Sequence, residues 1–225
     1  MTFPITLSPS ILPSNFGGFA ESVRKLVDAG ATMLHIDIMD GHFVPNLTFG
    51  PQLVRDLRPL TDAFFDCHLM VERVENYVPE LADAGANMLT FHPEATYHVD
   101  RLVHHIQDAG MKAGVALNPA TSIASCEWVL PIVDRILVMT VNPGYGGQEF
   151  IAHMTEKIER LAAIREQSGY RFEIAVDGGI SPETAPAVVR AGANVLIAGS
   201  AVFKHAGGMG AALAQLREAG EAARA

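Results

Sequence analysis

Apolar and polar positions alternate along the chain in two recurring patterns, one typical of buried strands and one typical of amphipathic helices. The short apolar runs predict eight strands, near Ile5–Leu12, Met33–Met39, Ala63–Met70, Met88–His92, Lys112–Asn118, Arg135–Asn142, Phe172–Gly178 and Val195–Ser200. A helical pattern follows each strand, for example in "FAESVRKLVDAG", "VENYVPELADAG", "VDRLVHHIQDAG" and "FIAHMTEKIERLAAIREQSG".

Four similar segments mark the passage from a helix to the next strand: "LVDAGATMLHIDI", "LADAGANMLTFHP", "IQDAGMKAGVALN" and "VVRAGANVLIAGS". In each of them a helix ends at a glycine that suits a left-handed cap, namely Gly30, Gly85, Gly110 or Gly192. The same helix-to-strand joint is therefore used repeatedly.

Strands that alternate with helices predict a parallel sheet, and eight such units are what a closed (β/α)8 TIM barrel requires. We therefore expect an α/β fold with a single barrel domain over residues 1–225. The alternative is a doubly wound open sheet. It is disfavoured because no predicted strand is followed by a GxGxxG turn.

The composition excludes several classes of partner. A chain of 225 residues that is 49% hydrophobic can bury a large core. Its net charge of -9 and its scattered basic residues disfavour nucleic acid as a partner. No run of about 20 apolar residues could span a membrane, and the N-terminus lacks the pattern of a secretory signal. Only Cys67 and Cys126 are present, which suits a reducing compartment and predicts a cytoplasmic location.

Two polar residues in the second predicted strand point to chemistry inside the barrel. Side chains alternate between the faces of a strand, so His35, Asp37 and Met39 share one face, while Ile36 and Ile38 share the other. The isoleucines suit the face that packs against helices. His35 and Asp37 are therefore expected to point into the barrel, where active sites lie at the carboxyl ends of the strands.

His68 from the third strand and Asp177 from the seventh are expected to reach the same interior. With His35 and Asp37 they form the nitrogen and oxygen ligand set of one divalent metal ion, such as zinc, iron(II), manganese or cobalt. A cation would offset the cost of burying these groups. The alternative is a hydrogen-bonded polar cluster without a metal.

Other strand ends supply candidates for the wall of the site and for phosphate binding. Met39, Met70 and Met139 could exclude water from the site, although methionines in strands also serve simply as core. Backbone amides in glycine-rich turns bind phosphate, and barrels commonly place this site after the seventh and eighth strands. The phosphate candidates are Gly144, Tyr145, Gly146, Gly147, Gly178, Gly179, Gly199 and Ser200.

A metal, two carboxylates and a phosphate site together suit proton transfer next to a carbonyl group. The metal would polarise the carbonyl, one aspartate would remove a proton and the other would return one. If the two aspartates act on opposite faces of the carbon, its configuration inverts, which is epimerisation. No lysine is expected inside the barrel mouth, so Schiff-base chemistry is disfavoured.

The segments "LSPSIL", "HIDIMDGHFVPNLTFG", "DCHLMV", "GVALNPAT", "VMTVNPGYGGQEF", "VDGGI" and "AGSAVF" follow one another over nearly the whole chain. In this order they resemble the ribulose-phosphate 3-epimerase family of ribulose-phosphate-binding barrels. The resemblance implies an isomerase that interconverts D-ribulose 5-phosphate and D-xylulose 5-phosphate through a metal-stabilised enediolate. The pathway implied is the pentose phosphate pathway or the Calvin cycle.

The resemblance also implies roles for single residues. The implied metal ligands are His35, Asp37, His68 and Asp177, with Asp37 as the base, Asp177 as the acid, and Ser10 and His68 as substrate contacts. Tyr145 is a departure, because many family members carry Phe in this loop, but a hydroxyl group there should alter little. Since barrel helices commonly pack into closed assemblies, we expect a homo-oligomer, either a dimer or a hexamer, that binds a small phosphosugar.

Other functions on the same scaffold stay open. A sister ketose-phosphate 3-epimerase, acting for example on D-allulose 6-phosphate, would share the chemistry. A non-catalytic phosphosugar-binding barrel is possible because a fold does not fix a function, but it would not need the paired aspartates. A metal-free decarboxylase or an aldol-type lyase is disfavoured by the missing interior lysines.

Overall fold

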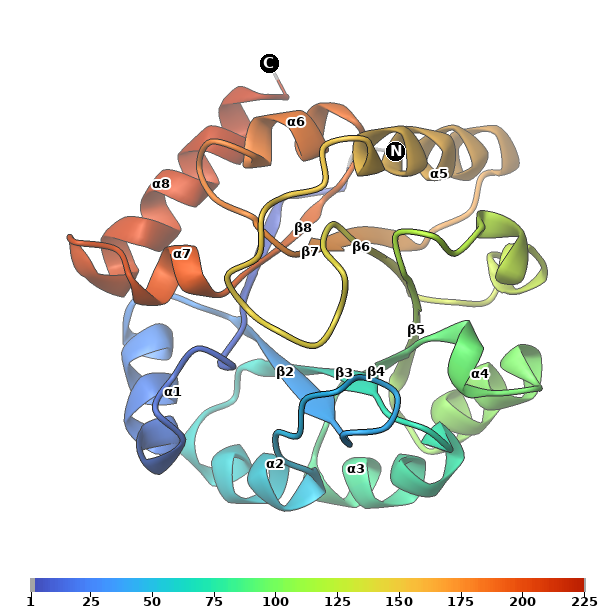
Figure 1. The fold of residues 1–225 in the computed structure, drawn as a ribbon, viewed down its shortest axis with the longest axis horizontal. Helices are drawn as coiled ribbons and strands as arrows, with labels where there is room; N and C mark the ends of the chain where they lie inside the picture. Colours follow the sequence, from blue (N-terminus) through green and yellow to red (C-terminus); the bar gives the residue numbers. More distant parts are fainter. Residues whose placement is uncertain (1–2, 225) are drawn as a thin grey trace.

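In the computed structural model, which describes residues 3–224, eight parallel strands form a barrel inside a ring of helices (Figure 1). The strands are β1 (Thr6–Pro9), β2 (Met33–Met39), β3 (Phe64–Met70), β4 (Met88–Phe91), β5 (Lys112–Leu117), β6 (Arg135–Met139), β7 (Glu173–Asp177) and β8 (Val195–Ala198). Their order in the sheet is β1-β8-β7-β6-β5-β4-β3-β2, and a bridge between Ser10 and His35 joins β1 to β2. The predicted TIM barrel is confirmed.

The α-helices follow the strands in the expected alternation at most positions. They are α1 (Phe19–Asp28), α2 (Pro51–Leu57), α3 (Val78–Ala84), α4 (Val99–Asp108), α5 (Met154–Ser168), α6 (Ala185–Arg190), α7 (Ser200–Phe203) and α8 (Gly208–Ala222). None of the helices within residues 3–224 has the length and apolar composition needed to cross a lipid bilayer.

The prediction of a helix after every strand is wrong for the connection between β5 and β6. Residues 118–134, all of them described, form two 3-10 helices, Ile123–Ser125 and Glu127–Val129, and no α-helix. Ser122 caps the first through the amide of Ala124, and Pro131 lacks the N–H that a continuing helix would use. The stretch "VENYVPELADAG" is likewise only partly α-helical, because Val74–Tyr77 form a 3-10 helix before α3.

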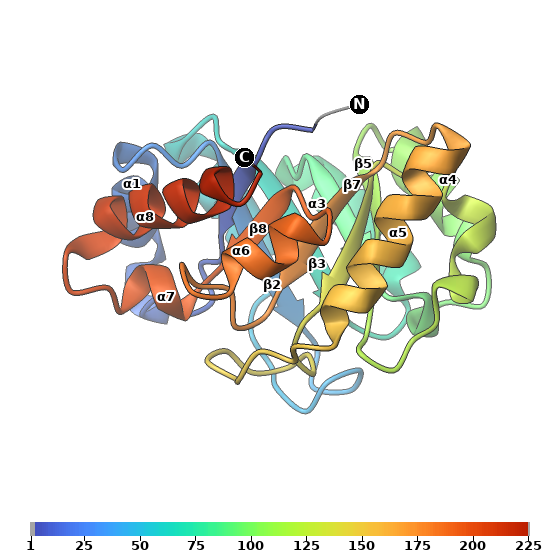
Figure 2. The same ribbon diagram turned by 90° about the horizontal axis from the view of Figure 1, so that it is seen from above.

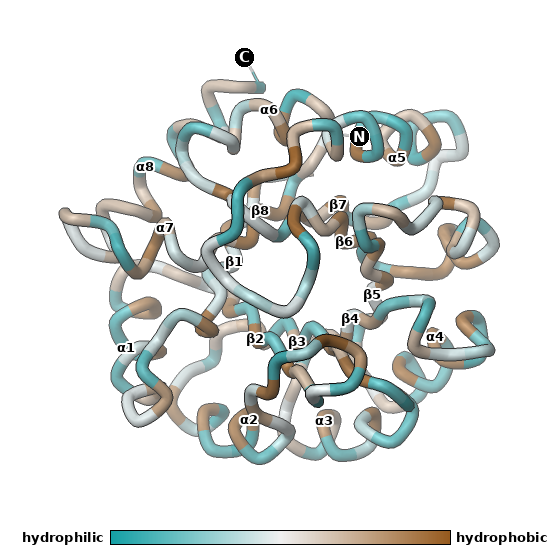
Figure 3. The backbone as a smooth tube through the Cα atoms, viewed as in Figure 1, coloured by the Kyte–Doolittle hydropathy of each residue, from teal (hydrophilic) through white to brown (hydrophobic). Residues whose placement is uncertain are grey.

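The strands are packed on both faces. Leu34, Ile36 and Ile38 of β2 belong to the large core between the sheet and the helices, whereas Met33 packs with Leu137 inside the barrel. The surrounding helices change between hydrophobic and hydrophilic stretches along their turns, as expected for helices with one buried face (Figure 3). This arrangement confirms the predicted orientation, in which alternate residues of β2 face inward.

The predicted caps have the expected backbone conformation. The φ angles of Gly30, Gly85, Gly110 and Gly192 are 91°, 90°, 84° and 113°, in the left-handed region that glycine adopts without strain.

Two long loops project from the same end of the barrel (Figure 2). The first follows β2 and the second, containing "NPGYGGQEF", follows β6. Asn46 Nδ2 donates a 2.9 Å hydrogen bond to the carbonyl oxygen of Gly144, so the two loops are connected. At the opposite end, the guanidinium group of Arg224 donates to the carbonyl of Phe3, and the described ends of the chain therefore lie side by side.

Candidate active site

A cavity of about 260 Å³ opens at the carboxyl ends of the strands. Its lining includes all but two of the site residues predicted from the sequence: Ser10, Asp37, Met39, Met70, Met139, Gly144, Tyr145, Gly146, Gly147, Asp177, Gly178, Gly179, Gly199 and Ser200. The two remaining candidates, His35 and His68, are fully buried next to Asp37. The structure thus brings the predicted site residues together around one cavity.

Four of these residues converge as potential metal ligands. One donor atom from each of His35, Asp37, His68 and Asp177 lies within 4.8 Å of all the others. Asp37 Oδ1 is 3.2 Å from His35 Nε2 and 3.2 Å from His68 Nδ1, while Asp37 Oδ2 accepts a 2.7 Å hydrogen bond from Ser10 Oγ. The carboxylate of Asp37 is therefore central to the group.

The nitrogen of His35 gives an independent sign of fit to a cation. Its Nε2 atom is buried and, among residues 3–224, has no hydrogen-bond partner in suitable geometry, although a carboxylate oxygen lies nearby. Burying a polar atom without a hydrogen bond costs free energy, and binding of a cation by both His35 and Asp37 would remove that cost. Two imidazoles and two carboxylates are also the donor set that borderline divalent metals prefer.

The surroundings push the pKa values of the two aspartates apart. Burial acts to raise the pKa of Asp37, but the neighbouring His35 and His68 outweigh it and hold the pKa well below its usual range. Burial, together with the charge of Asp37, raises the pKa of Asp177 to about 7. Before a cation binds, one carboxylate is therefore held ionised and the other readily holds a proton.

The two histidines also differ. Burial opposes the charge on His35, but Asp37 and Asp66 outweigh it and raise the pKa of His35 well above its usual value. Burial lowers the pKa of His68, so its ring is neutral and already able to bind a metal.

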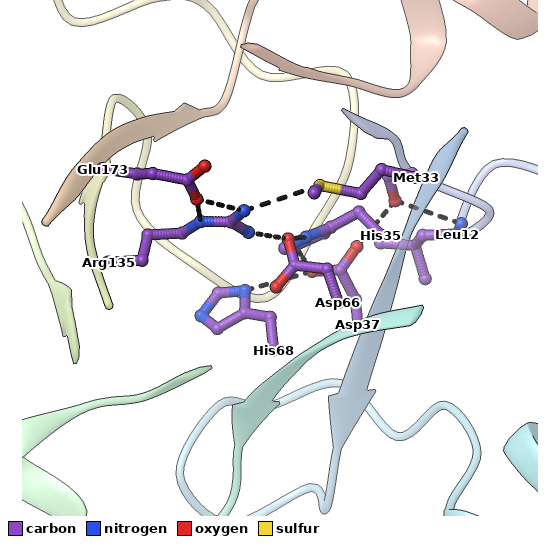
Figure 4. Close-up of polar contacts among 9 residues, drawn as sticks. Leu12, Met33, His35, Asp37, Asp66, His68, Arg135 and Glu173 are labelled. Carbon is purple, nitrogen blue, oxygen red and sulfur yellow. Dashed lines mark hydrogen bonds and ion pairs between the residues drawn. The ribbon is translucent and has the colours of Figure 1, made fainter. Parts of the chain in front are cut away.

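Sequence reasoning missed a buried ion network below the cavity (Figure 4). Asp66 Oδ2 lies 2.9 Å from His35 Nδ1 and 2.6 Å from Arg135 Nη1, and Arg135 Nη2 lies 2.7 Å from Glu173 Oε2. The signal was present in the strand alternation, because Asp66 precedes His68 by two residues and Arg135 shares the inward face with Leu137 and Met139.

His92, the last residue of the fourth predicted strand, is a further residue to which the sequence analysis gives no role. It is fully buried, and its Nε2 lies 2.9 Å from His68 Nε2. Because the other nitrogen of the His68 ring faces Asp37, His92 restrains the rotation of that ring.

Known proteins match both the sequence and the fold. The sequence model of the ribulose-phosphate 3 epimerase family matches residues 6–203. The ribulose-phosphate 3-epimerase of Bacillus subtilis (strain 168) is 46% identical over 200 residues, which cover 88% of this chain and 92% of that protein. The chloroplastic ribulose-5-phosphate-3-epimerase of Arabidopsis thaliana is 47% identical over 201 residues, covering 88% of this chain and 72% of that protein. The crystal structure of KGPDC from Streptococcus mutans has a TM-score of 0.73 at 17% identity, covers 100% of both chains, and supports the barrel fold alone.

Proposed function

The chain belongs to the ribulose-phosphate 3-epimerase family and is an isomerase, and from this premise we propose that it interconverts D-ribulose 5-phosphate and D-xylulose 5-phosphate by inverting C3. The observation that carries the proposal is the position of Asp37 and Asp177. They come from β2 and β7, which are not neighbours in the sheet, and both line the cavity. Two carboxylates on one reacting carbon are what inversion by two proton transfers requires.

We assign the base to Asp37 and the acid to Asp177. Asp37 is held ionised by its histidine neighbours and can accept the proton from C3 of D-ribulose 5-phosphate. Asp177, whose pKa is raised, readily takes up a proton from solvent and can deliver it to the opposite face. A pair of titratable groups with pKa values pushed apart is the usual arrangement for acid and base roles. In the reverse direction the two residues exchange roles.

We further propose that His35, Asp37, His68 and Asp177 hold one divalent cation, namely Zn, Fe(II), Mn or Co. When bound, such a cation supplies Lewis acidity toward the carbonyl oxygen next to C3. Ser10 orients the carboxylate of Asp37 through its hydroxyl and also lines the cavity, where it can contact the substrate. Met39, Met70 and Met139 form an apolar wall that excludes water from the reacting carbon.

The substrate phosphate is assigned to the glycine-rich segments that line the same cavity. Gly144–Gly147, Gly178–Gly179 and Gly199–Ser200 follow β6, β7 and β8, and all line the cavity. Gly178 and Gly179 have φ angles of 116° and 64°, which other residues rarely adopt. Such turns direct backbone amides toward an anion without intervening side chains.

The biological setting is also proposed. A single barrel domain over residues 1–225 acts as a homo-oligomer, a dimer or a hexamer, in the cytoplasm, in line with the small number of cysteines. The reaction belongs to the pentose phosphate pathway, and the similarity to a chloroplastic relative also fits the Calvin cycle.

The two-aspartate assignment is tested with Asp37→Asn and Asp177→Asn in heavy water. Each variant should lose about 100-fold or more in turnover, the range for removing a general acid or base. Starting from D-ribulose 5-phosphate, Asp177→Asn should still exchange deuterium into recovered substrate, whereas Asp37→Asn should not. Starting from D-xylulose 5-phosphate, the behaviour of the two variants should be reversed.

Metal content must be measured in both variants, because loss of the cation would also lower turnover. Equal deuterium uptake by the two metal-loaded variants, or near-normal epimerisation by either, would contradict the assignment. Comparing turnover of the unmodified enzyme on D-ribulose 5-phosphate and D-allulose 6-phosphate tests the substrate. Faster turnover of the six-carbon sugar would contradict the proposed substrate while leaving the chemistry intact.

A further inference from the structure

Beyond the residues that would touch a cation or a substrate, we propose that Asp66 is a positioning residue that, held by Arg135, fixes the ring of His35 for metal binding. The inference rests on the proposed metal site. Asp66 and Arg135 form a charged pair that neither lines the cavity nor belongs to the four candidate ligands. Figure 4 shows this pair between His35 and Glu173.

The contact with Asp66 fixes the tautomer of His35. Asp66 follows the same inward face of β3 as His68 and is 1% exposed. Its Oδ2 atom lies 2.9 Å from His35 Nδ1, and an ionised carboxylate can only accept, so Nδ1 must carry the hydrogen. In the neutral ring Nε2 then carries the unprotonated lone pair, which is the one that can bind a metal. That atom is the one that faces Asp37 Oδ1 at 3.2 Å.

The guanidinium group of Arg135 holds Asp66 in its charged form. Arg135 is fully buried, and its Nη1 atom donates to Asp66 Oδ2 over 2.6 Å. A guanidinium group is always protonated, and a carboxylate in direct hydrogen-bond contact with it is favoured in its ionised form. Glu173, whose side chain is 29% exposed, holds the guanidinium group from the other side. Arg135 therefore keeps Asp66 negatively charged next to a ligand histidine.

A purely structural role does not account for the ion pair between Asp66 and Arg135. A buried ion pair adds little net stability, because the cost of removing both charges from water nearly cancels their attraction. Among residues 3–224, moreover, Asp66 Oδ1 has no hydrogen-bond partner, so the pair is not optimised as a structural link. A carboxylate that accepts from the second nitrogen of a metal-binding histidine orients the ring and raises its basicity. Asp66 has the geometry for that task.

The test measures metal binding without any substrate. Metal-free protein is titrated with Co(II) in competition with a chromophoric chelator. Asp66→Asn should weaken Co(II) binding by about 10- to 100-fold, the range for losing such a partner, and the visible spectrum of bound Co(II) should change because the ring of His35 is less restrained. Glu173→Gln, which leaves the contact between Asp66 and His35 intact, is the matched control and should bind within about threefold of the unmodified protein.

The double variant Asp66→Asn/Arg135→Met separates positioning from folding. Removing both charges should restore any thermal stability that Asp66→Asn loses, but metal binding should stay weak. Binding restored along with stability, or unchanged binding in Asp66→Asn, would overturn the role of Asp66. If the unmodified protein itself binds no Co(II), Zn(II) or Mn(II), the proposed metal site fails, and that outcome is recognised before any variant is made.

Discussion

Metal binding by this site should release protons, and the number released should fall as the pH rises. In the metal-free protein, Asp37 and His68 are already in the forms that bind a cation, since the pKa of each is lowered. His35 and Asp177 are not, because the pKa of His35 is raised well above its usual value and that of Asp177 to about 7. Both must lose a proton before they can coordinate.

The expected numbers follow from these protonation states. At pH 6 a carboxyl group with a pKa near 7 is roughly 90% protonated, and at pH 8 roughly 10%. Because the pKa of His35 is raised as well, more than one proton should leave per cation at pH 6, and the contribution of Asp177 alone should fall by about 0.8 proton between pH 6 and pH 8. The contribution of Asp177 alone should weaken binding by about 25-fold between pH 7.5 and pH 5.5.

Isothermal titration calorimetry gives the number of protons directly. Metal-free protein is titrated with Mn(II) or Co(II) at each pH in two buffers that differ in ionisation enthalpy, and the difference in heat counts the protons. Asp177→Asn is the control, because it should remove the proton contributed by Asp177 and leave that of His35. Fewer than one proton at pH 6, or the same number at both pH values, would refute the reasoning.

Three further predictions concern the loops and the caps. Gly146→Val should raise KM for the phosphosugar by about tenfold without lowering Tm, because among the described residues only its chain neighbours could lie within 4 Å of the added Cβ, and its φ angle is one that other residues adopt. Unchanged KM and turnover would contradict the phosphate assignment. Asn46→Ala removes the hydrogen bond to Gly144 and should speed hydrogen exchange in the loop after β6, and equal exchange rates would show that this contact does not restrain the loop. Gly30→Ala should lower the unfolding free energy by about 1–2 kcal/mol, because alanine is disfavoured in the left-handed backbone conformation. Gly192→Ala should lower it distinctly more, because its added Cβ would also lie 2.5 Å from a methyl group of α5, whereas that of Gly30→Ala meets no such atom. Equal losses in urea unfolding would disprove the steric argument.

The strands could be predicted from the sequence because burial on both faces leaves a continuous apolar run, which is a local property. Their ends could not be predicted in the same way. Ser10, one residue beyond β1, forms an isolated bridge with His35 of β2, and this pairing exists only because the barrel closes. The connection after β5 was mistaken for an α-helix because its apolar spacing is helical. The α-helix does not form there, because Ser122 caps a 3-10 helix and Pro131 lacks a backbone N–H. The spacing of apolar residues carries neither of these effects.

For the site, the inward direction of His35 and Asp37 follows from alternation, so the convergence of the four candidate ligands could be predicted. The partners of those ligands could not. Asp66 and Arg135 lie on strands that are not neighbours in the sheet, and their contact depends on the stagger of the closed barrel. Alternation predicts which face of the sheet a side chain lies on. Its height along the barrel axis, which decides whether it meets a side chain from another strand, depends on the stagger of all the strands.

The contact between Arg224 and Phe3 makes this polypeptide suitable for circular permutation. Since the described ends of the chain adjoin at the end of the barrel away from the cavity, a short peptide could link them without approaching the reacting groups. New ends could be opened between β5 and β6, where two short 3-10 helices replace the α-helix found after the other strands. Such a circularly permuted enzyme would be synthesised in the order β6 to β5, with the glycine-rich half preceding the ligand-rich half. The barrel itself would be the same, because its closure does not depend on where the chain begins.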